Sequence, residues 1–180
     1  MAVLPIITVP DSRLKQVCAP VERVDAAVRR LMDDMLETMY RAPGIGLAAP
    51  QVGVRKRIIV LDVTKEEDEK QPHRLINPQL LWASEEEATY EEGCLSLPDQ
   101  YGEVVRPAAI RVRYLDEAGE LRERAADGLL ATCIQHEMDH LEGILFVDHL
   151  SALKRKMILR KLLKAKKAGK AVPADPAHVL

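Results

Sequence analysis

Residues 127–141, Asp-Gly-Leu-Leu-Ala-Thr-Cys-Ile-Gln-His-Glu-Met-Asp-His-Leu, determine how the rest of this sequence is interpreted. The stretch predicts a helix that opens at Asp-Gly and has as its apolar residues Leu130, Cys133, Ile134, Met138 and Leu141. His136 and His140 are four residues apart, so they project from one face and can bind one metal ion together. Glu137 stands beside the first histidine and can reach a water on the metal. This HExxH pattern is typical of metal hydrolases, in which the glutamate is the general base.

A third metal ligand has to come from elsewhere in the chain, and the downstream candidates are poor. The metzincin pattern would place a third histidine at position 146, which is Phe146. A downstream glutamate ligand is excluded because no glutamate follows Glu142, and the later acids are Asp148 and Asp175. His149 is available, but an apolar Gly-Ile-Leu-Phe segment that predicts a turn or short strand precedes it. An upstream ligand is therefore favoured.

Cys94 is the upstream candidate. It lies in the strand-like stretch Glu-Gly-Cys-Leu-Ser, residues 92–96, where Gly93 allows another backbone to come close. A thiolate, two neutral imidazoles and a water form the open tetrahedral site that catalytic metals use. We interpret Cys133 as a small apolar residue that lines the site and Cys18 as a core residue. A structural metal would need a closed set of four ligands, whereas this sequence offers three and a glutamate beside them.

The remaining pattern predicts two more helices with several strands around them. Residues 25–40 show helical spacing of apolar residues, with Asp25 at the N-cap and a methionine-rich stripe expected in the core. Ser151 can cap a basic helix that runs to about Lys167. Strands are predicted at 57–63, 75–77, 90–97, 104–106, 109–115 and 121–124. Turn signals lie at Asn77-Pro78, at 97–99 and at 117–119.

These elements predict an α+β fold in which antiparallel β-sheets pack around a central metal-binding helix, with an N-terminal helix and a C-terminal helix. We expect one domain over residues 1–167, which includes the basic helix 151–167, and a flexible tail over 168–180. The chain of 180 residues is 47% hydrophobic and 30% charged, which excludes a wholly disordered protein. It has no apolar run near the roughly 18 residues of a membrane span, so no membrane association is expected.

The charge and the cysteines add two expectations about surroundings. Residues 151–180 hold nine basic residues and one acidic residue, a balance of +8, while residues 1–150 have a balance of −10. The basic arm therefore favours an anionic partner such as nucleic acid, with a solubilising helix as the simpler alternative. The N-terminus lacks a signal-peptide pattern, and three widely spaced cysteines are a poor disulfide framework. Both features indicate the cytoplasm.

Three motifs in order give a family resemblance. Gly-Ile-Gly-Leu-Ala-Ala-Pro-Gln at 44–51, Glu-Gly-Cys-Leu-Ser at 92–96 and Gln-His-Glu-Met-Asp-His at 135–140 are followed by Leu-Glu-Gly-Ile-Leu-Phe. Together they resemble the bacterial peptide deformylases, and the resemblance covers about residues 3–164. It implies a metal-dependent hydrolase that removes the formyl group from the N-terminal formyl-methionine of new polypeptides and releases formate. The alternatives are a small zinc peptidase and a structural-metal RNA-binding protein.

The resemblance also implies roles for individual residues. Gln51 and the backbone N–H of Leu95 would stabilise the oxyanion, beside the catalytic Glu137 and a metal held by Cys94, His136 and His140. Two segments would pair with an extended peptide, Gly44-Ile45-Gly46 and Glu92-Gly93-Cys94. The methionine pocket would be walled by Ile45, Thr132, Cys133 and His136, with Thr132 standing where a larger aliphatic residue is expected. Arg106 would steer the downstream substrate backbone.

The metal and the partners complete these expectations. Two histidines and a cysteine suit Zn²⁺ and Fe²⁺ about equally. The resemblance implies Fe²⁺ in cells, replaceable by Zn²⁺, Ni²⁺ or Co²⁺. It also implies nascent polypeptides as substrates and contact between the basic helix 151–167 and the ribosome surface.

Overall fold

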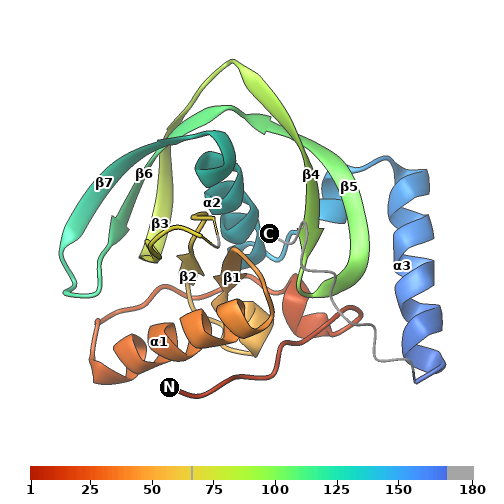
Figure 1. Ribbon diagram of the computed structural model, residues 1–180, viewed down its shortest axis with the longest axis horizontal. Coiled ribbons are helices and arrows are strands. Elements are labelled where there is room, and N and C mark those ends of the chain that lie inside the picture. The colour runs from red at the N-terminus through yellow and green to blue at the C-terminus, as the bar shows by residue number, and fades with distance from the viewer. Residues whose placement is uncertain (66, 170–180) are drawn as a thin grey trace.

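The computed structural model describes residues 1–65 and 67–169 and has helices and strands in both halves of the chain (Figure 1). The α-helices are α1 (Ala26–Arg41), α2 (Gly128–Leu141) and α3 (Ala152–Lys167). The strands are β1 (Gly46–Ala48), β2 (Ile58–Leu61), β3 (His73–Ala83), β4 (Glu87–Cys94), β5 (Leu97–Pro107), β6 (Ala109–Leu115) and β7 (Leu121–Asp127). Three short 3-10 helices, η1 (Ser12–Lys15), η2 (Ala49–Val52) and η3 (Phe146–His149), connect them.

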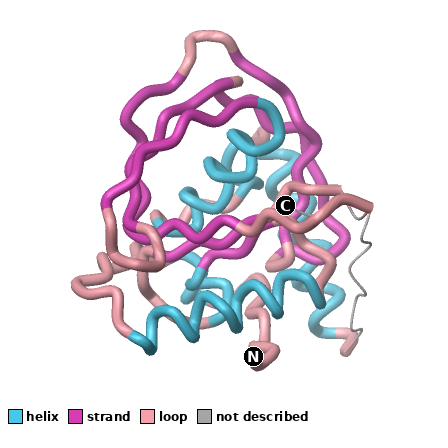
Figure 2. Tube along the Cα trace, turned by 60° about the vertical axis from the view of Figure 1, so that its left-hand side comes forward, coloured by secondary structure: helices cyan, strands magenta, loops and turns pink. Residues whose placement is uncertain are grey.

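Helix α2 lies at the centre of the molecule, between two antiparallel sheets. One sheet has the strand order β1-β2-β3-β6-β7, and the other is the β4-β5 hairpin. Figure 2 shows α2 enclosed by these strands, while α3 stands at the outer side of the β4-β5 hairpin in Figure 1. The predicted α+β architecture around a central helix is therefore confirmed. No helix in the described part of the chain is long and apolar enough to span a membrane.

The helix ends follow the capping chemistry predicted from the sequence. The Asp25 side chain accepts a hydrogen bond from the backbone N–H of Val28 at 2.9 Å, and Ser151 accepts one from Lys154. Helix α2 ends before Gly143, whose φ of +71° only glycine adopts readily. A Cβ at Gly143 would lie 2.6 Å from the Lys15 carbonyl carbon, so this turn also needs glycine for close packing.

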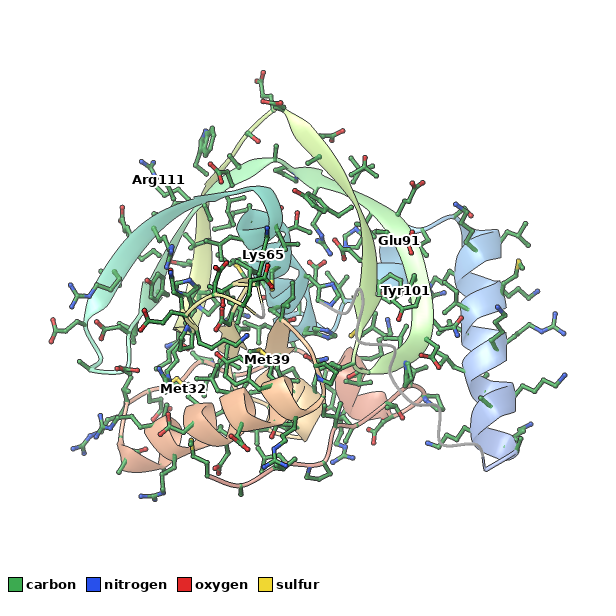
Figure 3. The ribbon with its side chains drawn as sticks, viewed as in Figure 1. Met32, Met39, Lys65, Glu91, Tyr101 and Arg111 are labelled. Carbon is green, nitrogen blue, oxygen red and sulfur yellow. The ribbon has the colours of Figure 1, made fainter. Side chains whose placement is uncertain are left out.

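Helix α1 covers the sheet with methionines. Met32, Met35 and Met39 are completely buried against strand residues such as Ile58 and Val60. Figure 3 shows Met32 and Met39 pointing from α1 toward the interior of the molecule. The predicted methionine stripe is therefore part of the core, where flexible thioethers fill irregular gaps.

Several predicted strand boundaries are wrong. The turn expected at 97–99 and the strand expected at 104–106 both lie within the single strand β5. Strand β3 continues through Asn77-Pro78, where a turn was expected, because a register shift absorbs the irregular residues there. Asn77 has a φ of 51° and its side chain exchanges two hydrogen bonds with the backbone of Val21, at 2.8 and 2.9 Å. The predicted strand 90–97 instead reverses at Leu95-Ser96, the two residues between β4 and β5. The flexible tail predicted for 168–180 falls, from residue 170 on, outside the described residues.

Candidate metal centre

Three side chains converge where the end of β4 meets α2. Cys94 is the last residue of β4, and His136 and His140 lie on successive turns of α2. One ligand atom from each residue lies within 4.8 Å of the other two, and all three side chains are buried. The Cys94 Sγ is 3.3 Å from Nε2 of His140. The fold therefore brings together the three residues that the sequence pattern indicates as ligands.

The donor set fits a divalent metal ion. Nδ1 of His136 is bonded to Glu92. The other ring nitrogen, Nε2, is buried and has no hydrogen-bond partner among the described residues. Buried polar atoms nearly always have a partner, so an unpaired imidazole nitrogen beside a thiol indicates a ligand position. Burial and nearby positive groups lower the pKa of His140 well below its usual value, which keeps that ring in the neutral form that binds metals.

His136 has the opposite protonation behaviour. Burial disfavours its charged form, but the neighbouring Cys94 thiol and the hydrogen bond to Glu92 outweigh burial and raise the pKa of His136 well above its usual value. A metal must therefore displace a proton from this ring, which is the ordinary coupling between metal binding and proton release.

Glu137 lies beside these ligands with a free carboxylate. Both of its oxygens are buried and lack hydrogen-bond partners within the described part of the chain. Burial is the main cause that raises the pKa of Glu137 to about 7, in the range where a carboxyl group can both accept and donate a proton. Strand β1 passes directly over this group: a Cβ on Gly46 would lie 2.9 Å from Cys133 Sγ and collide with the Glu137 carboxylate.

Gln51 is oriented toward the same centre. Its Oε1 accepts a hydrogen bond from the backbone N–H of Ala48 at 2.8 Å, which fixes the amide so that Nε2 faces the other way. Nε2 donates to Ser96 Oγ at 3.2 Å and approaches Cys94 Sγ at 3.5 Å. A buried amide donor is thus held beside the ligand cysteine, with Leu95 in the turn that follows it.

One residue expected to meet a substrate, Arg106, lies elsewhere. Arg106 is buried, and it pairs with Glu92 through Nε at 2.6 Å and Nη2 at 3.0 Å and with Asp139 through Nη1 at 2.9 Å. Its guanidinium is therefore occupied inside the protein, contrary to the expectation that it steers a peptide backbone. The Glu92 side chain is also turned inward, toward His136 at 2.9 Å. Neither partner is near Arg106 in the sequence, which is why the motif did not indicate this pairing.

The other expected substrate residues lie on or beside β1, β4 and α2. Strand β1 is at the edge of its sheet, and the carbonyl of Ile45 just before it accepts a hydrogen bond from the Asp62 N–H on the β2 side at 2.9 Å. Cys133 Sγ donates to the same carbonyl at 3.6 Å. Ile45 is partly exposed, whereas Gly44, Gly46, Gly93, Thr132 and Cys133 are buried.

Three residues near the site, Asp139, Ser96 and His149, have no role that the sequence pattern alone predicts. Asp139 stands inside the histidine motif, three residues after His136, and binds both Arg106 and His149. The position of Asp139 in the motif is the one signal of its importance in the sequence. Its partner residues lie on other elements, so only the fold identifies them.

Comparisons with known proteins agree over nearly the whole chain. The family model described as polypeptide deformylase matches residues 3–156. A peptide deformylase of Phenylobacterium zucineum is 60% identical over 169 residues, which cover 94% of this chain and 100% of the relative. One of Rhizobium meliloti is 60% identical over 167 residues, covering 93% of this chain and 96% of the relative. The crystal structure of peptide deformylase from Ehrlichia chaffeensis has a TM-score of 0.89 at 44% identity, covering 93% of this chain and 99% of that chain.

Proposed function

This chain belongs to the polypeptide deformylase family, and on that premise we propose how its own residues carry out the reaction. It is an enzyme, a metal-dependent hydrolase that removes the formyl group from the N-terminal formyl-methionine of new polypeptides and releases formate. The observation that carries our assignment of roles is the convergence of Cys94, His136 and His140 beside the unpaired carboxylate of Glu137. The small zinc peptidase and the RNA-binding protein considered from the sequence have no comparable support.

Cys94, His136 and His140 hold one divalent ion in this proposal. The bound ion would supply Lewis-acid chemistry, lowering the pKa of a water toward neutrality and polarising the formyl carbonyl. One thiolate and two imidazoles suit several first-row metals, so the ligand set alone leaves the choice to availability. We propose Fe²⁺ in cells, as the family resemblance implies, with Zn²⁺, Ni²⁺ or Co²⁺ supporting the same site in preparations.

Glu137 moves the proton. A water attacks the formyl carbon, and its proton passes to the Glu137 carboxylate as the carbon–oxygen bond forms. Glu137 then gives this proton to the methionine nitrogen while the carbon–nitrogen bond breaks. The products are a peptide with a free amino group and formic acid, which loses its acidic proton to water and is released as formate. The unpaired oxygens of Glu137 and its raised pKa support this double role.

Gln51 and Leu95 stabilise the negative charge that develops on the formyl oxygen. The anchored amide of Gln51 directs its Nε2 toward Cys94, and the backbone N–H of Leu95 follows directly after that ligand. Donors that are already in place stabilise a transition state without reorganisation at the moment of reaction.

The substrate peptide extends along the open edge of β1. Because β2 pairs with one side of β1 and no further strand of the described chain pairs with the other, backbone groups of residues 44–46 are suited to strand addition. Residues 92–94 form the opposite side of this path. The methionine side chain enters a pocket walled by Ile45, Thr132, Cys133 and His136. We assign Arg106 and the Glu92 carboxylate to support of the site rather than to contact with the peptide.

The basic helix α3 is proposed to contact the ribosome surface. Its lysines and arginines are exposed, while Leu162 anchors the helix in a cluster that also contains Phe146 and Cys94. This anchoring supports residues 1–167 as one functional unit. Three free cysteines and a substrate that leaves the ribosome together favour the cytoplasm.

Formate release from formyl-Met-Ala-Ser tests the assignment. Protein reconstituted anaerobically with Fe²⁺ is expected to release formate, and the metal-free protein is expected to release none. Acetyl-Met-Ala-Ser and casein serve as controls, because a zinc peptidase would cleave casein at internal bonds. Casein cleavage without formate release would contradict the proposed function.

A further inference from the structure

A continuous series of polar side chains connects the metal ligand His136 to the surface. His136 Nδ1 lies 2.9 Å from Glu92 Oε2, and Glu92 accepts two hydrogen bonds from Arg106, at 2.6 and 3.0 Å. The remaining Arg106 contact is Nη1 to Asp139 Oδ2 at 2.9 Å. The same Asp139 oxygen lies 2.7 Å from His149 Nε2. We call Glu92, Arg106, Asp139 and His149 the support chain.

Exposure rises steadily along the support chain. The side chain of Glu92 is 0% exposed, that of Arg106 6%, that of Asp139 21% and that of His149 35%. The chain therefore begins in the core and ends at the surface on η3, just before the N-terminus of α3. Its members come from β4, β5, α2 and η3, so it links the two elements that carry the metal ligands, β4 and α2, to β5 and η3.

Arg106 needs Asp139 for both geometric and electrostatic reasons. Two of its N–H groups bind Glu92, and without Asp139 the buried Nη1 would lose its partner, which disfavours the observed orientation. Asp139 also neutralises part of the positive charge of the Arg106 guanidinium. Glu92 is then less strongly neutralised by Arg106 and remains a strong acceptor for the His136 ring N–H. A carboxylate that accepts this N–H fixes the ring and makes it a better metal ligand.

His149 holds the outer end of the support chain. Asp139 is partly open to water, where a lone carboxylate would exchange between protein and solvent partners. The His149 ring from η3 binds the oxygen that faces Arg106, and η3 is itself fixed because Asp148 accepts a hydrogen bond from the Leu145 N–H at 2.9 Å.

We propose that Asp139 is a positioning residue for the metal ligand His136, acting through Arg106 and Glu92, and that His149 holds Asp139 in place. This inference rests on the proposed metal site. It concerns residues that touch neither the substrate nor the metal. It predicts that a change at Asp139, which reaches His136 through Arg106 and Glu92, alters the rate at which the protein loses the metal.

The test compares Asp139→Asn with Asp116→Asn in Co²⁺-loaded protein. Asp116 is a matched control because its side chain is 23% exposed, close to the 21% of Asp139, and because it pairs with an arginine outside the support chain, Arg122 at 2.8 Å. Removal of a group that supports a metal ligand typically costs about 10–100-fold in metal affinity, so Asp139→Asn is expected to speed Co²⁺ loss to a chelator about tenfold. The visible Co²⁺ absorption bands of Asp139→Asn should shift, while Asp116→Asn keeps the wild-type rate and bands.

Two further variants test the role of His149. His149→Gln retains a side-chain donor and is expected to behave as wild type, whereas His149→Phe should speed metal loss by about threefold, less than the direct partners of ligands do. Wild-type rates and spectra in Asp139→Asn, or equal changes in Asp139→Asn and Asp116→Asn, would overturn the inference while leaving the metal site intact. A wild-type protein that binds no Co²⁺ at Cys94 and His136 would overturn the proposed function as well.

Discussion

Helices α2 and α3 are similar in length, with 14 and 16 residues, but they lie in opposite surroundings. Most of α2 is buried, including the polar side chains of Thr132, His136, Glu137 and His140. In α3 the described side chains are largely exposed, and Leu162 is its buried residue. Buried polar groups require partners, so the contacts of α2 define its chemistry. Exposed charges have no such requirement, so the function of α3 depends on molecules outside this chain.

Loss of a metal ligand should give the largest effect. This effect should concern the metal centre beside α2 and leave α3 unchanged. Cys94→Ala leaves two imidazoles for the metal, and we expect the purified variant to contain almost no bound metal and to release no measurable formate. Metal analysis after gel filtration checks this result. A variant that keeps one ion per chain would exclude Cys94 as a ligand.

Glu137→Gln should separate catalysis from metal binding within α2. The amide keeps the shape of the side chain but cannot accept the proton, and general acid–base groups typically contribute about 10²–10⁴-fold to rates. We expect a loss of that size in kcat for formyl-Met-Ala-Ser with unchanged metal content. Near-normal turnover would refute the role of the carboxylate, and loss of the metal would make Glu137 structural.

Leu162→Ala should weaken the attachment of α3 without changing α2. Truncation of a buried leucine costs about 2–5 kcal/mol, and Leu162, which is 6% exposed, is expected near the lower end, about 2–3 kcal/mol. Denaturant unfolding measures the change in the free energy of unfolding. Formate release by the folded fraction should equal that of wild type, and a large loss of kcat would mean that α3 acts on the active site.

Charge reversal on α3 should give the smallest effect, seen only with the ribosome. Arg160 and Lys164 are exposed, and replacing both with glutamate leaves Leu162 in its cluster, unlike truncation after Leu150. The slope of log K for ribosome binding against log salt concentration should become shallower by about 0.7–0.9 for each phosphate that the variant no longer neutralises. Co-sedimentation at low and moderate salt measures this. Equal ribosome binding by the double variant and the wild-type protein would contradict the proposed contact between α3 and the ribosome surface.

The same contrast explains what the sequence could predict. The spacing of His136 and His140 on α2 and the caps at Asp25 and Ser151 depend on residues close together in the chain. The structure contains both caps and brings the two histidines together on one side of α2. The continuation of β3 through Asn77 depends on Val21, 56 residues away, and a local pattern does not reveal it. Arg106 was misplaced for a similar reason, because its partners Glu92 and Asp139 meet it only after β4, β5 and α2 have packed together.

X-ray absorption at the zinc edge of Zn²⁺-loaded protein tests the central claim most directly. If Cys94, His136 and His140 hold the ion, the spectrum should show one sulfur at about 2.3 Å and two imidazole nitrogens at about 2.0–2.1 Å, with one further light atom from water. The sulfur contribution should disappear in any metal that Cys94→Ala retains. A wild-type spectrum without sulfur, or with a single imidazole, would contradict this account.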